Sequence, residues 1–98
     1  MQANNILFHE LIGLEVKVTD SPAITVIGTK GVVIDETMNT LVIQKPDGKR
    51  NTILKDHNEF TFTVPDGTKI PVCGNLLVGR PWDRLKNIGK RQFRLTNR

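Results

Sequence analysis

Few side chains in this 98-residue chain have the type and spacing that metal binding or covalent catalysis requires. Cys73, His9 and His57 are far apart in sequence and lack the short spacings of structural zinc sites. A nucleophilic enzyme would need a cysteine or serine close to a histidine, and the sequence does not suggest such a pair. We predict no metal on this chain, a strand position for Cys73 and an exposed loop position for His57.

Acidic pairs are the second possible source of chemistry, because paired carboxylates can hold magnesium for phosphodiester cleavage. Asp35 and Glu36 fall in the turn of a predicted hairpin, and Asp56 and Glu59 fall in a polar connection. Carboxylates at such positions are solvated by default. The sequence therefore disfavours an autonomous nuclease, and we predict no catalytic residue.

Binding of a polyanion is the chemistry that the charge distribution favours. Residues 80–98 hold seven basic side chains and one acidic one, a net charge of +6, whereas residues 1–79 hold seven basic and nine acidic ones, a net charge of −2. A near-neutral body with a basic end is typical of proteins that bind nucleic acid. The predicted RNA contacts are Lys30, Thr37, Asn39, Arg80, Arg84, Lys86, Lys90 and Arg91.

The aromatic residues do not suggest a surface on which bases could stack. The chain has no tyrosine, and Phe60 and Phe62 alternate with threonines in the pattern of core residues. Binding through the RNA backbone and its shape is therefore more credible than base stacking. Lys45, Lys49 and Arg50 could also contact phosphates, but we favour their interpretation as a solvated turn.

A central hairpin must position these side chains. Two apolar runs, residues 32–34 and 41–43, flank a six-residue polar turn, which is the pattern of a tight antiparallel hairpin. Gly28 and Gly31 precede the first run and predict a bulge or a sharp bend. We place the turn at Met38 and Asn39, because asparagine tolerates a positive φ angle.

Short strands separated by turns account for most of the remaining chain. Strands are predicted at 14–19, 51–55, 60–64, 70–72 and 76–78, with 24–27 as a short strand or extended approach and Pro-Asp-Gly turns near 46–48 and 65–67. Such a meander predicts an all-β antiparallel sandwich or small barrel, and a barrel of five to seven strands would leave no open edge. We predict one domain, with residues 13–79 as the barrel.

Helical spacing of apolar residues predicts a helix at each end of the chain. We expect residues 4–12 to form a helix that covers the core, docks a partner or does both, and residues 81–88 to form a second helix within a basic segment at 80–98. No apolar run approaches the roughly 20 residues of a membrane span, and the N-terminus lacks the layout of a signal peptide. Together with a single cysteine, this predicts a cytoplasmic protein without a membrane partner.

Three segments resemble one known family over almost the whole chain. LFHELIGLEVKV (residues 7–18), GTKGVVIDETMNTLVIQ (28–44) and GRPWDRLK (79–86) are similar to the archaeal ribonuclease P protein component 1 family. The hairpin alone also resembles ribosomal and transcription-factor barrels, which leaves an interaction module of that type as the alternative. Trp82 departs from the family pattern, in which we expect an acidic residue.

The resemblance implies a strongly bent antiparallel barrel, Sm-like or SH3-like, with short terminal helices. It implies a noncatalytic subunit that binds ribonuclease P RNA, while that RNA uses Mg²⁺ to remove 5′ leaders from precursor tRNA, which the chain meets only indirectly. It further implies a zinc-ribbon protein subunit as partner, with RNA contacts at Arg80, Arg84 and Lys86. The implied partner interface consists of Leu7, Phe8, Leu11, Val32 and Ile34.

Overall fold

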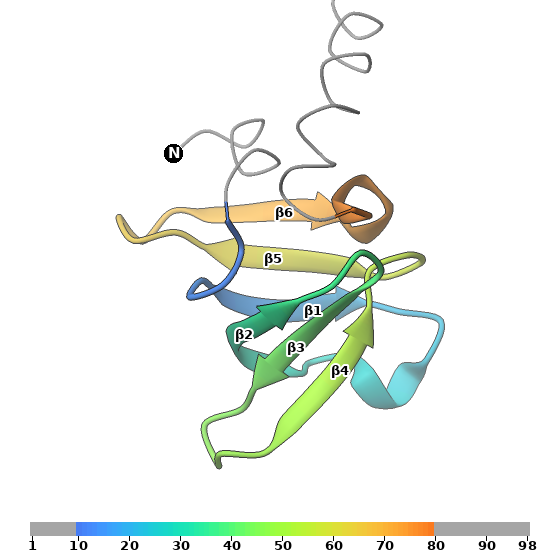
Figure 1. The fold of residues 1–98 in the computed structure, drawn as a ribbon, viewed down its shortest axis with the longest axis horizontal. Helices are drawn as coiled ribbons and strands as arrows, with labels where there is room; N and C mark the ends of the chain where they lie inside the picture. The colour runs from blue at the N-terminus through green and yellow to red at the C-terminus, as the bar shows by residue number, and fades with distance from the viewer. Residues whose placement is uncertain (1–9, 80–98) are drawn as a thin grey trace, which may run out of the picture.

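The computed structural model describes residues 10–79, which form one six-stranded antiparallel sheet (Figure 1). The strands are β1 (Glu15–Asp20), β2 (Lys30–Glu36), β3 (Thr40–Gln44), β4 (Arg50–Leu54), β5 (Glu59–Thr63) and β6 (Lys69–Cys73). Their order across the sheet is β4-β3-β2-β1-β5-β6. The all-β antiparallel prediction is therefore confirmed. The predicted helix at 81–88 and most of the one at 4–12 lie outside the described residues.

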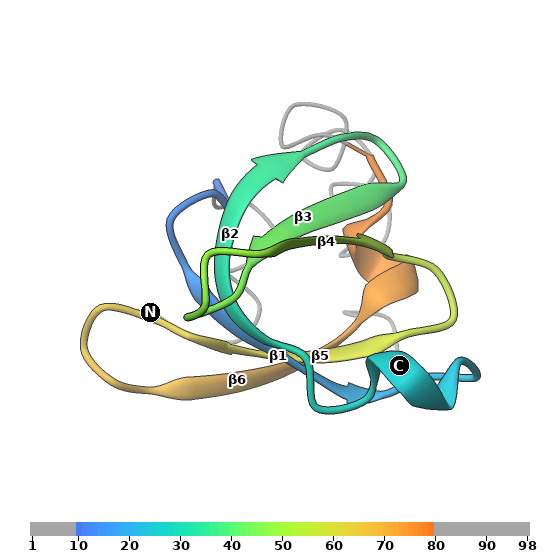
Figure 2. The same ribbon diagram turned by 90° about the horizontal axis from the view of Figure 1, so that it is seen from below.

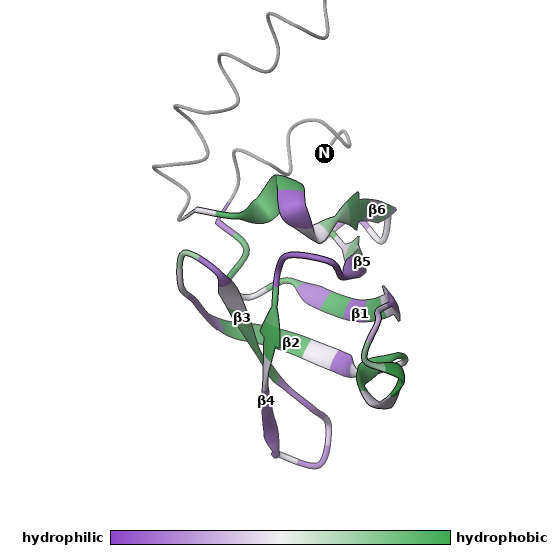
Figure 3. Cartoon of the chain, turned by 90° about the vertical axis from the view of Figure 1, so that its right-hand side faces the viewer, coloured by the Kyte–Doolittle hydropathy of each residue, from purple (hydrophilic) through white to green (hydrophobic). Residues whose placement is uncertain are grey.

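Alternation of side chains along the strands builds the core on one side of the sheet. In β1, Val16 and Val18 are buried while Glu15 and Lys17 are exposed, and Figure 3 shows this alternation as changing colours along the strand. The prediction that Phe60 and Phe62 are core residues is confirmed, because both are fully buried. The complete buried apolar set is Leu11, Leu14, Val16, Val18, Val33, Leu41, Ile43, Ile53, Phe60, Phe62, Val64, Ile70, Val72 and Leu77.

Two features of β2 bend the sheet strongly. The register with β3 pairs Val33 with Ile43 but Asp35 with Val42, so Ile34 is an extra residue in a β-bulge. The second feature is the close approach of β2 to β3 at Gly31. Only glycine fits there, because a Cβ atom would overlap the carbonyl oxygen of Gln44. The bend that the sequence predicts before and within this strand is therefore present.

The bent sheet does not close into a barrel, which corrects the prediction of a closed one. Figure 2 shows the strands curling around a common centre, yet among the described residues β4 pairs only with β3 and β6 only with β5. Pro71 in the edge strand β6 has no N–H to donate to a further strand. The strand expected at 76–78 is also wrong, since Gly74–Leu77 forms a 3-10 helix, η3.

Local hydrogen bonds define the turns. In both Pro-Asp-Gly turns the aspartate accepts a backbone N–H two residues on, and Gly48 and Gly67 have positive φ angles of 87° and 90°. At Asp66 the backbone N–H and the hydroxyl of Thr68 donate to the carboxylate and lower its pKa. These turns match the prediction from their sequence.

Two local predictions were wrong. The hairpin turn lies at Met38 and Asn39 as predicted, but Asn39 does not have a positive φ. Thr37 holds the turn instead, because its hydroxyl oxygen accepts the N–H of Thr40 at 3.0 Å. Residues 24–27 are not a strand, because Ile24–Val26 forms a 3-10 helix, η2. Neither η2 nor any other helix among the described residues is long and apolar enough to cross a membrane.

Leu11 and Ile12 provide a matched test of the core. Leu11 is fully buried, whereas Ile12 is 44% exposed. Leu11→Ala should lower the free energy of unfolding by about 2–5 kcal/mol, because it leaves a cavity, and Ile12→Ala should change it by less than about 0.5 kcal/mol. Urea unfolding followed by circular dichroism measures both. Equal effects of the two changes would contradict this packing.

Candidate nucleic-acid interface

A fully buried lysine connects the hairpin turn to the end of the described chain. The Lys55 ammonium lies 2.7 Å from Glu36 Oε2 and forms an ion pair with it. It also donates to the carbonyl oxygens of Thr37 at 2.7 Å, Met38 at 3.2 Å and Gly79 at 2.8 Å. An ammonium has three hydrogens, so the four acceptors share them, and the contact to Met38 is the longest.

The strand periodicity explains why these two charged side chains point inward. Ile53 of β4 faces the core, and Lys55 lies two residues further on the same side. In β2, Val33 faces inward, and the bulge then shifts the phase so that Glu36 rather than Asp35 is buried. The prediction that both carboxylates of this acidic pair are solvated was therefore wrong for Glu36.

The same network holds residue 79 beside the hairpin turn, which is one of the predicted RNA-binding regions. The N–H of Gly79 donates to the Met38 carbonyl at 2.7 Å, so residue 79 is held against the hairpin turn. Thr37 and Asn39 lie in that turn, and the Lys55 N–H donates to the Asn39 carbonyl at 2.8 Å. In the sequence, the basic segment follows residue 79 directly.

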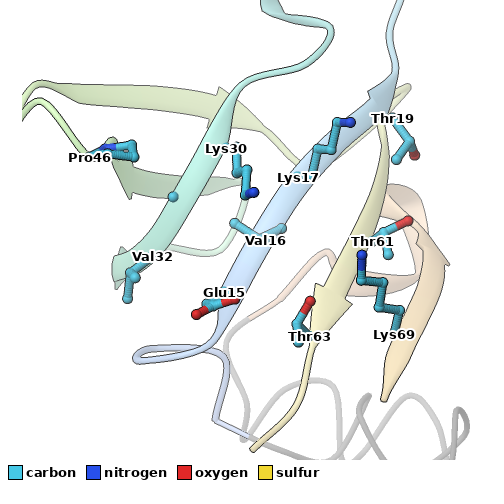
Figure 4. A pocket seen from close by; sticks show the side chains of 11 residues that line it. Glu15, Val16, Lys17, Thr19, Lys30, Val32, Pro46, Thr61, Thr63 and Lys69 are labelled. Atoms are coloured by element: carbon cyan, nitrogen blue, oxygen red, sulfur yellow. The ribbon is translucent and has the colours of Figure 1, made fainter. Parts of the chain in front are cut away.

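Lys30 lies on a different surface from the hairpin turn. It is exposed at the start of β2, directly opposite Lys17 of β1, and both line a shallow hollow of about 520 Å³ with Lys69 of β6 (Figure 4). The sequence interpretation missed Lys17 and Lys69. The alternation of β1 already places Lys17 on the face of the strand away from the buried valines. Its proximity to Lys30 and Lys69 could not be predicted, because it depends on the pairing of strands that are distant in sequence.

The predicted partner-interface residues occupy different environments. Val32 is 38% exposed and lines the same hollow, Ile34 is half-buried in the bulge, and Leu11 belongs to the core. The remaining predicted contacts lie outside the described residues: Leu7, Phe8, Arg80, Arg84, Lys86, Lys90 and Arg91. The roles assigned to all of these side chains stay predictions.

The candidate catalytic side chains have simple surroundings. His57 is exposed and lies 3.3 Å from Asp56, and Cys73 is exposed at the end of β6, as the sequence predicts. Within residues 10–79, no three His, Cys, Asp or Glu side chains group in a way that could hold a metal ion.

Comparisons with known proteins point to one family. The family model for ribonuclease P/MRP subunit p29 matches residues 4–87. Ribonuclease P protein component 1 of Desulfurococcus amylolyticus is 44% identical over 92% of this chain and 98% of its own length. The protein of the same name from Methanocaldococcus jannaschii is 52% identical over 85% of this chain and 86% of its own length.

A solved structure agrees with these relatives. The structure of Mth11, described as a homologue of the human RNase P protein Rpp29, is similar with a TM-score of 0.58 at 42% identity. The match covers 78% of this chain and 97% of that one. The sequence relatives and the similar solved structure are therefore all described as ribonuclease P proteins or their homologues.

Lys55→Met tests the buried network. It removes the positive charge and leaves Glu36 buried without its cation, which should lower the free energy of unfolding by about 3–5 kcal/mol. The double change Lys55→Met with Glu36→Leu should recover only part of the loss, because the carbonyls of Thr37 and Gly79 still lack their donor. Chemical denaturation of the wild type, Lys55→Met, Glu36→Leu and the double variant measures the coupling energy between the two side chains. Unchanged stability in the single variant would refute the assigned role.

Proposed function

This chain belongs to the ribonuclease P/MRP subunit p29 family, and we propose that it is an RNA-binding, noncatalytic protein subunit of ribonuclease P. In this proposal the RNA of the enzyme, with its Mg²⁺, removes 5′ leaders from precursor tRNA, and the chain supports that RNA. The observation that carries the proposal is the family match over residues 4–87, which includes the start of the basic segment.

The anchoring of residue 79 supports a role in RNA binding. A basic segment binds a folded RNA more tightly when its origin is fixed, because less conformational freedom is lost on binding. Here Lys55 and Met38 hold both polar groups of the Gly79 backbone against the sheet. Residue 79, which precedes the basic segment in the sequence, is therefore a fixed point beside the hairpin turn.

The acidic side chains that a nuclease would need have local structural roles instead. Asp35 accepts the N–H of Glu36 at 2.8 Å, and Asp56 accepts the N–H of His57 at 3.1 Å. Glu36 pairs with Lys55 in the core. These contacts favour a structural role for each carboxylate over catalysis by this chain.

The proposal includes a protein partner and a location. We infer that a zinc-ribbon subunit of ribonuclease P contacts the chain through the predicted interface, of which Val32 is an exposed apolar side chain on β2. The zinc would belong to that partner and the magnesium to the RNA. We further infer a cytoplasmic complex, because one exposed free cysteine suits a reducing compartment.

Reconstitution tests the proposal directly. The chain alone, with magnesium, should leave precursor tRNA uncut, whereas addition of the chain and its partner subunits to ribonuclease P RNA should increase cleavage. The chain should also bind that RNA on filters with an affinity that falls steeply as salt rises. Cleavage by the RNA-free chain, or no salt-sensitive affinity for the RNA, would refute the proposal.

Charge reversal in the basic segment tests its share of the binding. Arg80→Glu with Arg84→Glu should weaken the affinity for ribonuclease P RNA by about tenfold or more, because two phosphate contacts become repulsive. The melting temperature should stay nearly unchanged. Arg80→Lys with Arg84→Lys is the matched control, which keeps the charge and should keep most of the affinity. Equal affinity of the reversed and wild-type proteins would exclude this segment as the site.

A further inference from the structure

Four strands present two rows of side chains on the outer face of the sheet. The register places Lys30 of β2 opposite Lys17 of β1, and Lys17 opposite Thr61 of β5. In the second row Glu15 of β1 lies between Val32 and Thr63, and Thr63 lies opposite Lys69 of β6. Neighbouring strands are about 4.8 Å apart, so three lysines share a face only a few strands wide (Figure 4).

The Lys17–Lys30 pair is unfavourable in the free protein. Like charges directly opposite each other on neighbouring strands destabilise a sheet. Within residues 10–79, neither lysine lies within ion-pair distance of a carboxylate, although Glu15 is on the same face. An anion between the two ammonium groups would remove their repulsion.

The surroundings of the lysines suit a phosphate backbone. The hollow on this face has a volume of about 520 Å³ and is also lined by Thr61 and Thr63, whose hydroxyls can donate hydrogen bonds to phosphate oxygens. Pro46 lines the hollow too, so the turn between β3 and β4 lies at its rim. That turn carries Lys45 and Lys49, which extend the positive charge beyond β2.

We propose that Lys17, Lys30 and Lys69 on the outer face of β1, β2 and β6 form a second RNA-binding surface, which contacts phosphates of the RNA backbone. This inference rests on the proposed function as an RNA-binding subunit. The surface is separate from the hairpin turn and residue 79, because Lys30 lies at the opposite end of β2 from Thr37. RNA would then contact the domain on two surfaces.

Phosphate fits this face better than an acidic protein segment does. Lysine binds phosphate as a point charge without demanding a planar partner, and the hydroxyls beside it suit phosphate oxygens. The single carboxylate, Glu15, lies in the middle of the face and should repel any anion there. Its removal therefore offers a test in which binding improves.

Neutralising the lysine pair should weaken RNA binding. Lys17→Ala with Lys30→Ala should lower the affinity for ribonuclease P RNA by about tenfold at low ionic strength, and the slope of log affinity against log salt should become shallower by about 1 to 2. The melting temperature should stay equal or rise, since the variant removes a repulsive pair. Filter binding over a salt series and thermal melting measure these changes.

Removal of a single acid gives the opposite change with a matched control. Glu15→Gln should tighten RNA binding severalfold, whereas Asp56→Asn should leave it unchanged. Both changes raise the net charge by one, but Asp56 lies in the connection between β4 and β5 and does not line the hollow. An equal gain in RNA affinity from both changes would indicate a general charge effect and would refute the proposed second surface.

The outcomes separate this inference from the function that it rests on. If the wild-type chain has no salt-sensitive affinity for the RNA, the proposed function fails. If the wild-type chain binds RNA and the Lys17/Lys30 variant binds it equally well, only the second surface is refuted. Loss of binding to the zinc-ribbon subunit, with RNA binding unchanged, would likewise overturn it and assign the three lysines, like Val32 beside them, to the protein interface.

Discussion

The structure depends on a buried positive charge. An ammonium is costly to remove from water unless a counter-charge and hydrogen-bond acceptors surround it. Lys55 has a carboxylate and three backbone carbonyls at hydrogen-bond distance, and they come from the end of β2, the hairpin turn and residue 79. This side chain thus ties residue 79, which belongs to no strand, to the β2–β3 hairpin and the end of β4.

The bulge in β2 determines which of its side chains point into the core and which point outward, where they can contact a ligand. Before the bulge at Ile34, Lys30 and Val32 point outward; after it, Glu36 points inward to Lys55. Gly31 makes the bend possible because β3 approaches too closely for a side chain. One strand therefore contributes to an outward basic face and to the internal anchor of residue 79.

Much of this fold could be predicted from the sequence, because alternation and turn chemistry are local. The strands around Phe60 and Phe62 and the Pro-Asp-Gly turns follow from neighbouring residues alone. Pairing between distant segments could not be read in this way. Lys55 looked like the polar end of a strand. The apolar residues of the 3-10 helix at Gly74–Leu77 likewise resembled a strand.

The same distinction applies to the site. The basic end was visible as a run of charge, but the neighbours of Lys30 were not, because Lys17 and Lys69 are distant in sequence. The resemblance identified the family from whole segments, which the comparisons confirm. It could not say which lysines share a face, since that depends on the order β2-β1-β5-β6.

Lysine acetylation with and without ribonuclease P RNA, read by mass spectrometry, tests the central claim that an internal lysine supports a sheet whose outer lysines bind RNA. We expect Lys55 to be unreactive in both states, because it is fully buried. Lys17, Lys30 and Lys69 should react in the free protein and be protected by the RNA. Equal acetylation of these three lysines with and without RNA, or rapid acetylation of Lys55 in the free protein, would contradict the account.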